Sequence, residues 1–260
     1  MAPPVVVTRP RGPQGGLEAF IARLSESPVT PVVFSPQTIK FLSLLPNEEQ
    51  TVLDVLSSRA PAIAFLSPTA VFACKDLLHR LGRGQLDAST LLASQGPGTS
   101  DAIEACFGRR PFFESSVSTA EVFAEEFLKL APLVSGLLVP QSAIGRDVFA
   151  PLLKAGGVSV CEFAAYTLMT VTPGEDEQCA ISASAAKGGY IIFMSPSAVR
   201  ATLETCRDQE GLRRLKVISI GPTTSDAVRE TGLSLHVEAT DHSEEGVLSA
   251  LNRCVDASSF

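Results

Sequence analysis

The sequence predicts an α/β fold of two domains with parallel sheets. Three observations lead to this prediction: short apolar runs alternate with segments of helical period, the runs are apolar at consecutive positions, and two strand–turn–helix blocks occur twice. Continuous apolar runs are typical of strands buried on both faces, as in parallel sheets. Their alternation with helices favours right-handed βαβ units. A length of 260 residues fits two domains.

The strands are expected where β-branched and apolar residues run up to a Pro, Ser or Gly. These runs are Val5–Val7, Val29–Phe34, Ala62–Leu66, Leu91–Ala93, Phe112–Phe113, Leu137–Val139, Val158–Phe163, Tyr190–Met194, Leu215–Ile220 and Leu235–Val237. The helices are expected at the stripes Leu17–Leu24 and Val52–Leu56 and over Ala70–Leu81, Thr99–Cys106, Ala120–Leu130, Arg146–Leu153, Ala198–Cys206, Thr224–Thr231 and Glu245–Leu251. Asn47 and Gln50 are expected to form a capping box for the second helix.

An internal repeat indicates that the two domains are similar. Ala62–Val71 aligns with Tyr190–Val199 at an offset of 128 residues, and Gln95–Ala102 aligns with Ile220–Ala227 at an offset of 125. In each block a strand ends at a Ser-Pro or Gly-Pro turn and a helix begins at once, as helix-start preferences favour. The free amides of these helices point out of the carboxyl edge of the sheet, where α/β proteins bind ligands. The alternative is that these turns are ordinary helix caps.

Composition excludes several classes of protein. Hydrophobic residues make up 45% of the chain and charged residues 19%, so a disordered chain is excluded. A net charge of −7 argues against a nucleic-acid-binding protein. No apolar run reaches the roughly 18–20 residues that a membrane-spanning helix needs. The six cysteines are widely spaced and the three histidines lack partners at ligand spacing, so no metal site is expected. The first residues lack the charged start of a signal peptide, which favours a cytoplasmic protein.

An ordered set of motifs resembles the uroporphyrinogen-III synthase family. The motifs are Val5–Pro10, Phe65–Val71, Gly145–Arg146, Tyr166–Thr167, Phe193–Val199, Ile218–Ala227 and Ser243–Gly246. The resemblance implies two flavodoxin-like domains joined by a two-stranded linker, with one domain inserted into the other. Residues 1–35 and 168–260 would form one domain, and residues 36–167 would form the insert. Crossing strands are expected near Pro36–Leu45 and Ala164–Val171, with the active site in the cleft between the domains.

The resemblance also implies a reaction. Members of the family cyclise hydroxymethylbilane, a linear tetrapyrrole, with inversion of ring D and loss of water, to give uroporphyrinogen III. They are lyases of haem biosynthesis that need no metal or organic cofactor. We therefore expect a cytoplasmic monomer whose substrate is passed on transiently by the preceding pathway enzyme, with no nucleic-acid or membrane partner. The alternative is a non-catalytic, two-lobed protein that binds an anionic tetrapyrrole.

Tyr166 is the candidate catalytic acid, because a phenol is protonated at neutral pH and can donate to the departing hydroxyl. The alternative is a packed tyrosine with an exposed hydroxyl. Helix-terminal amides, hydroxyl groups and arginines are expected to bind the substrate carboxylates. The candidate substrate-binding residues are Thr8, Arg9, Arg11, Ser67, Thr69, Gly96, Gly98, Thr99, Ser100, Ser142, Arg146, Ser195, Ser197, Gly221, Thr223 and Thr224.

Overall fold

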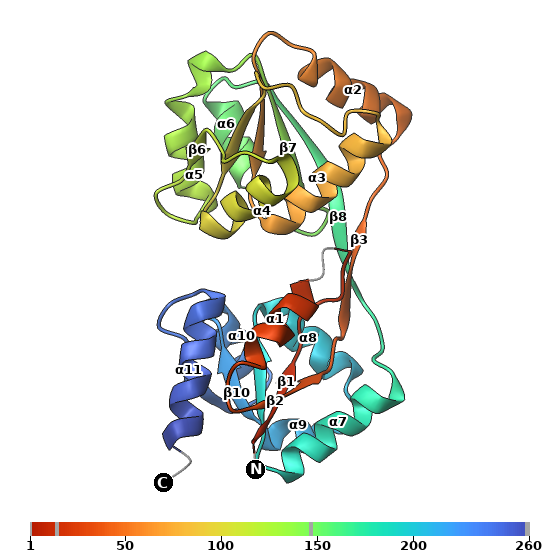
Figure 1. Cartoon of the computed structure of the whole chain (residues 1–260), viewed down its shortest axis with the longest axis vertical. Coiled ribbons are helices and arrows are strands. Elements are labelled where there is room, and N and C mark those ends of the chain that lie inside the picture. The colour runs from red at the N-terminus through yellow and green to blue at the C-terminus, as the bar shows by residue number, and fades with distance from the viewer. Residues whose placement is uncertain (1, 14–15, 146–147, 258–260) are drawn as a thin grey trace. The chain divides into compact units, whose positions relative to one another are not determined.

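The chain forms two compact units in the computed structural model, which describes residues 2–13, 16–145 and 148–257. Unit 1 comprises Met1–Ile39 and Leu168–Phe260, and unit 2 comprises Lys40–Thr167 (Figure 1). The sequence predicts that the insert begins after residue 35 and ends at residue 167. In the structure, unit 2 begins after residue 39 and ends at residue 167.

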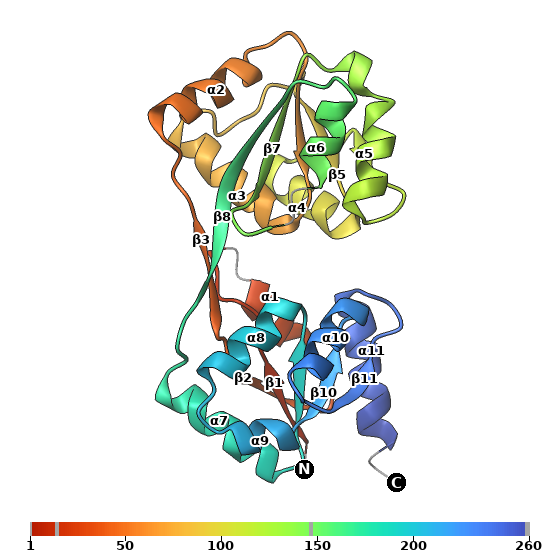
Figure 2. The ribbon, with the colours of Figure 1, turned by 180° about the vertical axis from the view of Figure 1, so that it is seen from behind.

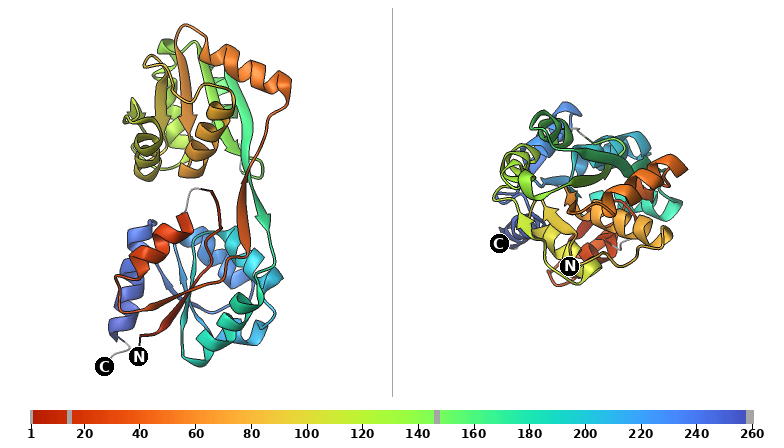
Figure 3. Two further views of the ribbon diagram at one scale, coloured as in Figure 1. Left: turned by 45° about the vertical axis from the view of Figure 1, so that its right-hand side comes forward. Right: turned by 90° about the horizontal axis from the view of Figure 1, so that it is seen from above.

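Two neighbouring strands connect the units. The chain leaves unit 1 along β3 (Gln37–Phe41) and returns along β8 (Val160–Thr170), and the two strands run side by side (Figure 3). Leu42 donates its amide to Ala165 and Val171 donates to Pro36, each at 2.9 Å. Because the residue numbers rise along one strand and fall along the other, this pair is antiparallel.

Unit 1 contains a five-stranded sheet in the order β11-β10-β9-β1-β2, and every pair in it is parallel. This is a doubly wound order in which the first strand of the chain is flanked by the second and third strands of the unit. The elements are β1 (Pro4–Val7), α1 (Gly16–Leu24), β2 (Thr30–Val33), α7 (Glu175–Ala186), β9 (Tyr190–Phe193), α8 (Pro196–Thr205), α9 (Gln209–Arg214), β10 (Lys216–Ser219), α10 (Pro222–Glu230), β11 (Leu235–Glu238) and α11 (Glu244–Ala257).

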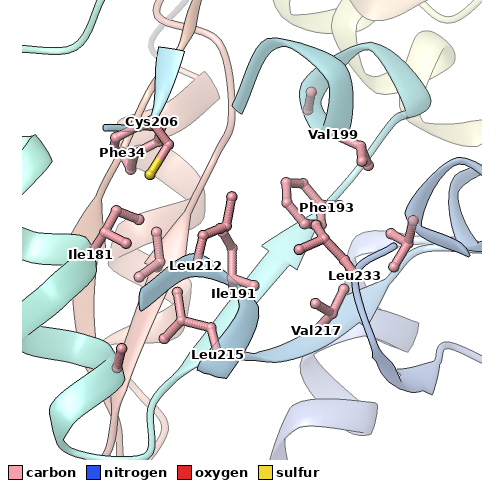
Figure 4. Close-up of a cluster of buried hydrophobic side chains, with 14 of the residues drawn as sticks. Phe34, Ile181, Ile191, Phe193, Val199, Cys206, Leu212, Leu215, Val217 and Leu233 are labelled. Carbon is pink, nitrogen blue, oxygen red and sulfur yellow. The ribbon is translucent and has the colours of Figure 1, made fainter. Parts of the chain in front are cut away.

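Helices cover both faces of this sheet. Alternate strand residues point to opposite faces, so Val6 and Ile191 pack in one cluster and Val5 and Ile192 in another. The first cluster packs against α7, α8, α9 and α10 (Figure 4), of which α7, α8 and α9 lie in front of the sheet in Figure 2. The second packs against α1 and α11. Burial on both faces explains why the strands are continuously apolar.

Unit 2 contains a sheet in the order β3-β8-β7-β4-β5-β6, parallel in every pair from β8 to β6. One face packs against α2, α3 and α4, and the other against α5 and α6. The elements besides β3 and β8 are α2 (Pro46–Leu56), β4 (Pro61–Phe65), α3 (Pro68–Arg80), β5 (Leu91–Ser94), α4 (Pro97–Phe107), β6 (Phe113–Glu114), α5 (Ala120–Leu128), the 3-10 helix η1 (Ala131–Leu133), β7 (Gly136–Ser142) and α6 (Phe149–Ala155). The predicted α/β fold with parallel sheets is confirmed.

The element order shows that the chain is a tandem repeat. Apart from β3, α9 and η1, the series β1-α1-β2-α2-β4-α3-β5-α4-β6-α5 is followed by the equivalent series β7-α6-β8-α7-β9-α8-β10-α10-β11-α11. In the sheets, β1 and β2 join the last three strands of the second series, and β7 and β8 join the last three of the first. Each unit is therefore built from the first βαβ segment of one repeat and the remainder of the other.

Several predicted elements need correction. The two segments expected at Val158–Phe163 and Ala164–Val171 form one continuous strand, β8. Helices α7 and α9 were not predicted; α7 is rich in Ala and Ser, so it lacks the stripe of large apolar residues that periodicity detects. The predicted capping box of Asn47 and Gln50 is wrong, because α2 begins earlier, at Pro46. Leu45 is its N-cap, and the Leu45 amide donates to Glu48 at 2.7 Å.

Candidate functional site

In each unit, a serine that follows a central strand caps the next helix. Ser67 follows β4 and its Oγ accepts from the Ala70 amide at 3.2 Å, and Ser195 follows β9 and accepts from Ala198 at 3.2 Å. Both serines are extended and are followed by a proline, the arrangement that helix starts favour. The predicted order of strand, Ser-Pro turn and helix is therefore present at both positions, 128 residues apart.

The two Gly-Pro turns leave little space for a side chain at the glycine. Gly96 and Gly221 have extended backbones, with φ of 175° and 173°, that any residue adopts. A Cβ on Gly96 would lie 2.2 Å from Ser118 Oγ, and one on Gly221 would lie 3.0 Å from His242 Cδ2. Each glycine thus lets the loop that precedes the following helix, α5 or α11, approach the turn closely.

Behind each Gly-Pro turn lies a buried chain of hydroxyl groups that sequence reasoning missed. In unit 2, Ser94 and Ser100 have their Oγ atoms 2.7 Å apart, and Ser100 donates to Glu114. In unit 1, Ser219, Ser225 and Glu238 repeat the arrangement, with 2.6 Å between the two Oγ atoms. All four serines are fully buried. The signal that could have found these residues is their recurrence at the offset of 124–125 residues that the Gly-Pro turns share.

These serine chains bear on the predicted substrate-binding residues. Ser100 was predicted to donate its hydroxyl to substrate, but the structure gives it two partners within the protein. Thr99 and Thr224 are also buried, with 5% and 1% of their surface exposed. The second residues of the four helices that follow the Ser-Pro and Gly-Pro turns are half-buried or exposed instead. They are Thr69 in α3, Gly98 in α4, Ser197 in α8 and Thr223 in α10.

Tyr166 lies beside the Ser-Pro turn of unit 2. Its hydroxyl oxygen is 3.2 Å from Ser67 Oγ, and either atom can be the donor. Tyr166 pairs with Ser142 across β8 and β7, and its carbonyl accepts from the Ala143 amide at 2.8 Å. The ring packs against the cluster that α2, α3 and α4 cover. Ser67 follows β4, Ser142 ends β7, and Tyr166 lies in β8 opposite Ser142, so these three predicted residues lie at the same edge of the parallel part of the sheet.

The predicted residues that follow β1 have partners within unit 1. Thr8 is buried and donates to the Ile192 carbonyl at 2.7 Å. Arg9 pairs with Glu244, and its guanidinium lies 5.3 Å from the centre of the Phe20 ring. Glu244 also binds Arg23 at 2.9 Å.

The other predicted arginines differ in what the structure shows. Arg11 is half-exposed and pairs with Glu177 at 3.0 Å. Arg146 lies outside the described residues.

We define the unit 2 rim as Ser67, Thr69, Gly96, Gly98, Ser142 and Tyr166, and the unit 1 rim as Thr8, Arg9, Ser195, Ser197, Gly221 and Thr223. Each rim combines helix N-termini with hydroxyl groups at the carboxyl edge of a parallel sheet, the edge at which α/β proteins bind ligands. Across the described ranges, no helix is both long enough and apolar enough to cross a membrane. In the same ranges, no group of three or more His, Cys, Asp or Glu residues is arranged to hold a metal ion.

The fold defines an α/β protein made of two doubly wound units. A family model described as uroporphyrinogen-III synthase HemD matches residues 18–249. The chain belongs to the uroporphyrinogen-III synthase family, as its motifs predict.

Solved structures of two bacterial proteins share the fold. Uroporphyrinogen-III synthetase from Helicobacter pylori is 17% identical, with a TM-score of 0.64 over 98% of this chain and 100% of that one. A mutant uroporphyrinogen III synthase from Thermus thermophilus is 18% identical, with a TM-score of 0.58 and the same coverage. No curated protein matches the sequence.

Proposed function

We propose that this chain cyclises hydroxymethylbilane to uroporphyrinogen III, with inversion of ring D and loss of water. Membership of the family over residues 18–249 is the observation that carries the proposal. In this reaction the terminal hydroxyl leaves with a proton as water, and an azafulvene cation remains. Ring D attacks this cation through its substituted position, and the spiro intermediate opens and recloses. Since simple closure without inversion proceeds unaided, the protein acts mainly by positioning the chain of pyrroles.

Tyr166 is proposed to donate a hydrogen bond to the departing hydroxyl. Its hydroxyl group lies at the carboxyl edge of the unit 2 sheet and contacts Ser67, so it is fixed by a neighbour at the edge where ligands bind. Donation from a weak acid helps most in the transition state, when negative charge develops on the leaving oxygen.

The rim helices are proposed to bind the carboxylates of the substrate. Their second residues, at positions 69, 98, 197 and 223, are half-buried or exposed, which leaves the first turns accessible to an anion. A helix N-terminus attracts anions through its unpaired amides and dipole, each worth about 0.3–1 kcal/mol at an exposed site. This accounts for how a chain of net charge −7 can bind a polyanion.

We further propose that the chain acts as a monomer in the cytoplasm and takes its substrate directly from the enzyme that makes it. The chain has six cysteines, and those at Cys74, Cys106, Cys161 and Cys206 are free, which supports a reducing compartment. Burial raises the pKa of Cys74 to about 12, so this thiol stays protonated at neutral pH. Because the free substrate closes spontaneously without inversion, direct transfer from the preceding enzyme reduces its loss to the type I product. Light scattering on the purified chain tests the monomer.

The experiment that tests the function is an isomer assay. Purified protein receives freshly made hydroxymethylbilane, and the porphyrin isomers are separated after oxidation, beside a reaction without protein. We expect type III product to form faster than the spontaneous type I product. If the protein yields type I product alone, at the rate of the reaction without protein, the proposal fails and a non-catalytic tetrapyrrole-binding role replaces it.

A further inference from the structure

We propose that Ser67 is a positioning residue, which donates its hydroxyl hydrogen to Tyr166 and so directs the phenol hydrogen toward the leaving hydroxyl of the substrate. This inference rests on the proposed function, because it assigns Ser67 a role in the same reaction. It differs from the role in substrate binding that the sequence predicts for Ser67.

The hydrogen bonds of Ser67 leave it one hydrogen to donate. A serine hydroxyl has one hydrogen and two acceptor positions. The Ala70 amide donates to one acceptor position of Ser67 Oγ at 3.2 Å. The second hydrogen-bond partner of Ser67 Oγ is the hydroxyl oxygen of Tyr166, also 3.2 Å away. When the phenol hydrogen points to the substrate, Tyr166 can no longer donate to Ser67. The bond between them then persists only if Ser67 is the donor.

The donors then run in one direction. The Ala70 amide donates to Ser67, Ser67 donates to Tyr166, and Tyr166 donates to the leaving hydroxyl. Successive hydrogen bonds of this kind polarise one another, and the first belongs to the N-terminus of α3, the positive end of the helix dipole. A donor on the phenol oxygen also stabilises the negative charge that grows there as its hydrogen moves to the substrate. No covalent bond of the protein forms or breaks in this chain of donors.

Unit 1 offers a matched serine without the tyrosine. Ser195 caps α8 at 3.2 Å, the same distance as Ser67 caps α3, but its second contact is with Ser197 at 3.0 Å. Replacing Ser195 therefore removes an equivalent cap and leaves Tyr166 untouched. The comparison separates loss of the cap, which both substitutions cause, from loss of the donor to Tyr166, which only one causes.

The test is a double-mutant cycle in the isomer assay, with kcat and KM measured for each variant. The variants are Ser67→Ala, Tyr166→Phe, Ser195→Ala, the two double variants with Tyr166→Phe, and Ser67→Thr. We expect Ser67→Ala to lower kcat by about tenfold, the size of one modest hydrogen bond, with KM nearly unchanged. The Ser67→Ala/Tyr166→Phe double variant should be no slower than Tyr166→Phe alone. Ser67→Thr, which keeps cap and donor, should restore kcat.

The control and the contradicting results are distinct. The effects of Ser195→Ala and Tyr166→Phe should multiply, because Ser195 bonds to Ala198 and Ser197 whereas Tyr166 bonds to Ser67. If the effects of Ser67→Ala and Tyr166→Phe also multiply, or if Ser67→Ala changes KM alone, Ser67 binds substrate and the inference is overturned while the proposed function stands. If Tyr166→Phe turns over as the wild type does, the proposed role of Tyr166 fails as well. Should Ser67→Ala unfold, Ser67→Gly takes its place, because glycine is tolerated at an N-cap.

Discussion

The unit 1 rim and the unit 2 rim share a scaffold and differ in the chemical groups placed on it. Both have a serine cap, a Gly-Pro turn with little space for a Cβ, and two buried serines whose hydrogen-bond chain ends on a glutamate. The unit 2 rim adds the hydroxyl of Tyr166, and the unit 1 rim adds Arg9, which Glu244 holds. The difference teaches that the repeat builds two edges with the same scaffold, whereas the residues proposed to act in the reaction are ones in which the two rims differ.

The exchange of βαβ segments explains how this asymmetry can arise. Tyr166 belongs to β8 of the second repeat, but β8 lies in the sheet of unit 2 with β4, a strand of the first repeat. Ser67, which follows β4, and Tyr166 therefore come from different repeats although they touch. A substitution in either repeat thus alters one unit without requiring the same change in the other.

The largest expected effect comes from removing the hydroxyl that distinguishes the two rims. Tyr166→Phe should lower kcat by about 100-fold, or about 2.7 kcal/mol, and raise the share of type I product, because the leaving hydroxyl loses its donor. Steady-state kinetics with isomer separation measures both. Tyr190→Phe is the control, since Tyr190 is the second tyrosine of the chain and is buried at the start of β9. A kcat for Tyr166→Phe that equals that of Tyr190→Phe would remove the phenol from the reaction.

The next effect tests the shared scaffold. Ser100→Ala and Ser225→Ala should each lower the free energy of unfolding by about 1–3 kcal/mol, because a buried serine and a carboxylate lose a partner. Denaturant unfolding, followed separately for the two units, measures the loss. Ser249→Ala, on the exposed face of α11, should stay within about 0.5 kcal/mol of wild type. A large loss of unfolding free energy in one unit and none in the other would show that the two Ser–Ser–Glu hydrogen-bond chains are not equivalent.

A smaller effect tests the cation of the unit 1 rim. Arg9→Gln should raise KM about threefold to tenfold and leave kcat unchanged, if its guanidinium binds a substrate carboxylate as well as Glu244. Arg23→Gln is the matched control, because Arg23 binds the same glutamate but was not predicted to touch substrate. The same rise in KM for both variants would mean that Arg9 acts by holding Glu244 and α11 in place.

The smallest effect concerns Glu126 of α5, whose carboxylate accepts hydrogen bonds from Ser115 and Ser116 in the loop before this helix. Hydrogen bonds from the Ser116 hydroxyl and amide lower the pKa of Glu126 from its ordinary 4.5. A group with a lowered pKa in the folded state stabilises the fold above its ordinary pKa, and this contribution is lost as the pH falls through the lowered value. The amide resonance of Ser116 should therefore shift with pH below 4.5. Glu126→Gln should abolish the shift; if the shift remains, another group causes it.

The sequence predicts the repeated features better than the hydroxyl partners. Parallel strands, the two serine caps and the family follow from apolar runs and short motifs, all of which are local in the chain. The Ser–Ser–Glu chains do not, because their members come from three separate elements and their spacing carries no familiar motif. The hydroxyls of Thr8 and Ser100 face inward to Ile192 and Glu114, a direction that residue type alone does not specify.

Local boundaries show the same limit. Ser118 and His242 approach Gly96 and Gly221 closely from the next loop, and residue spacing cannot reveal such a contact. Likewise, β8 runs on without a break from Val160 to Thr170 because it pairs first with β7 and then with β3. Features fixed by contacts between distant segments need the fold before they can be seen.

The most direct test of the account compares the two matched serines in one assay. Ser67→Ala and Ser195→Ala remove equivalent helix caps, so any difference between them reflects what distinguishes the rims. We expect Ser67→Ala to lower kcat by about tenfold with KM nearly unchanged, and Ser195→Ala to raise KM with kcat nearly unchanged. If the two variants change kcat and KM alike, Ser67 acts only as a helix cap, and the claim that it positions the Tyr166 hydroxyl is wrong.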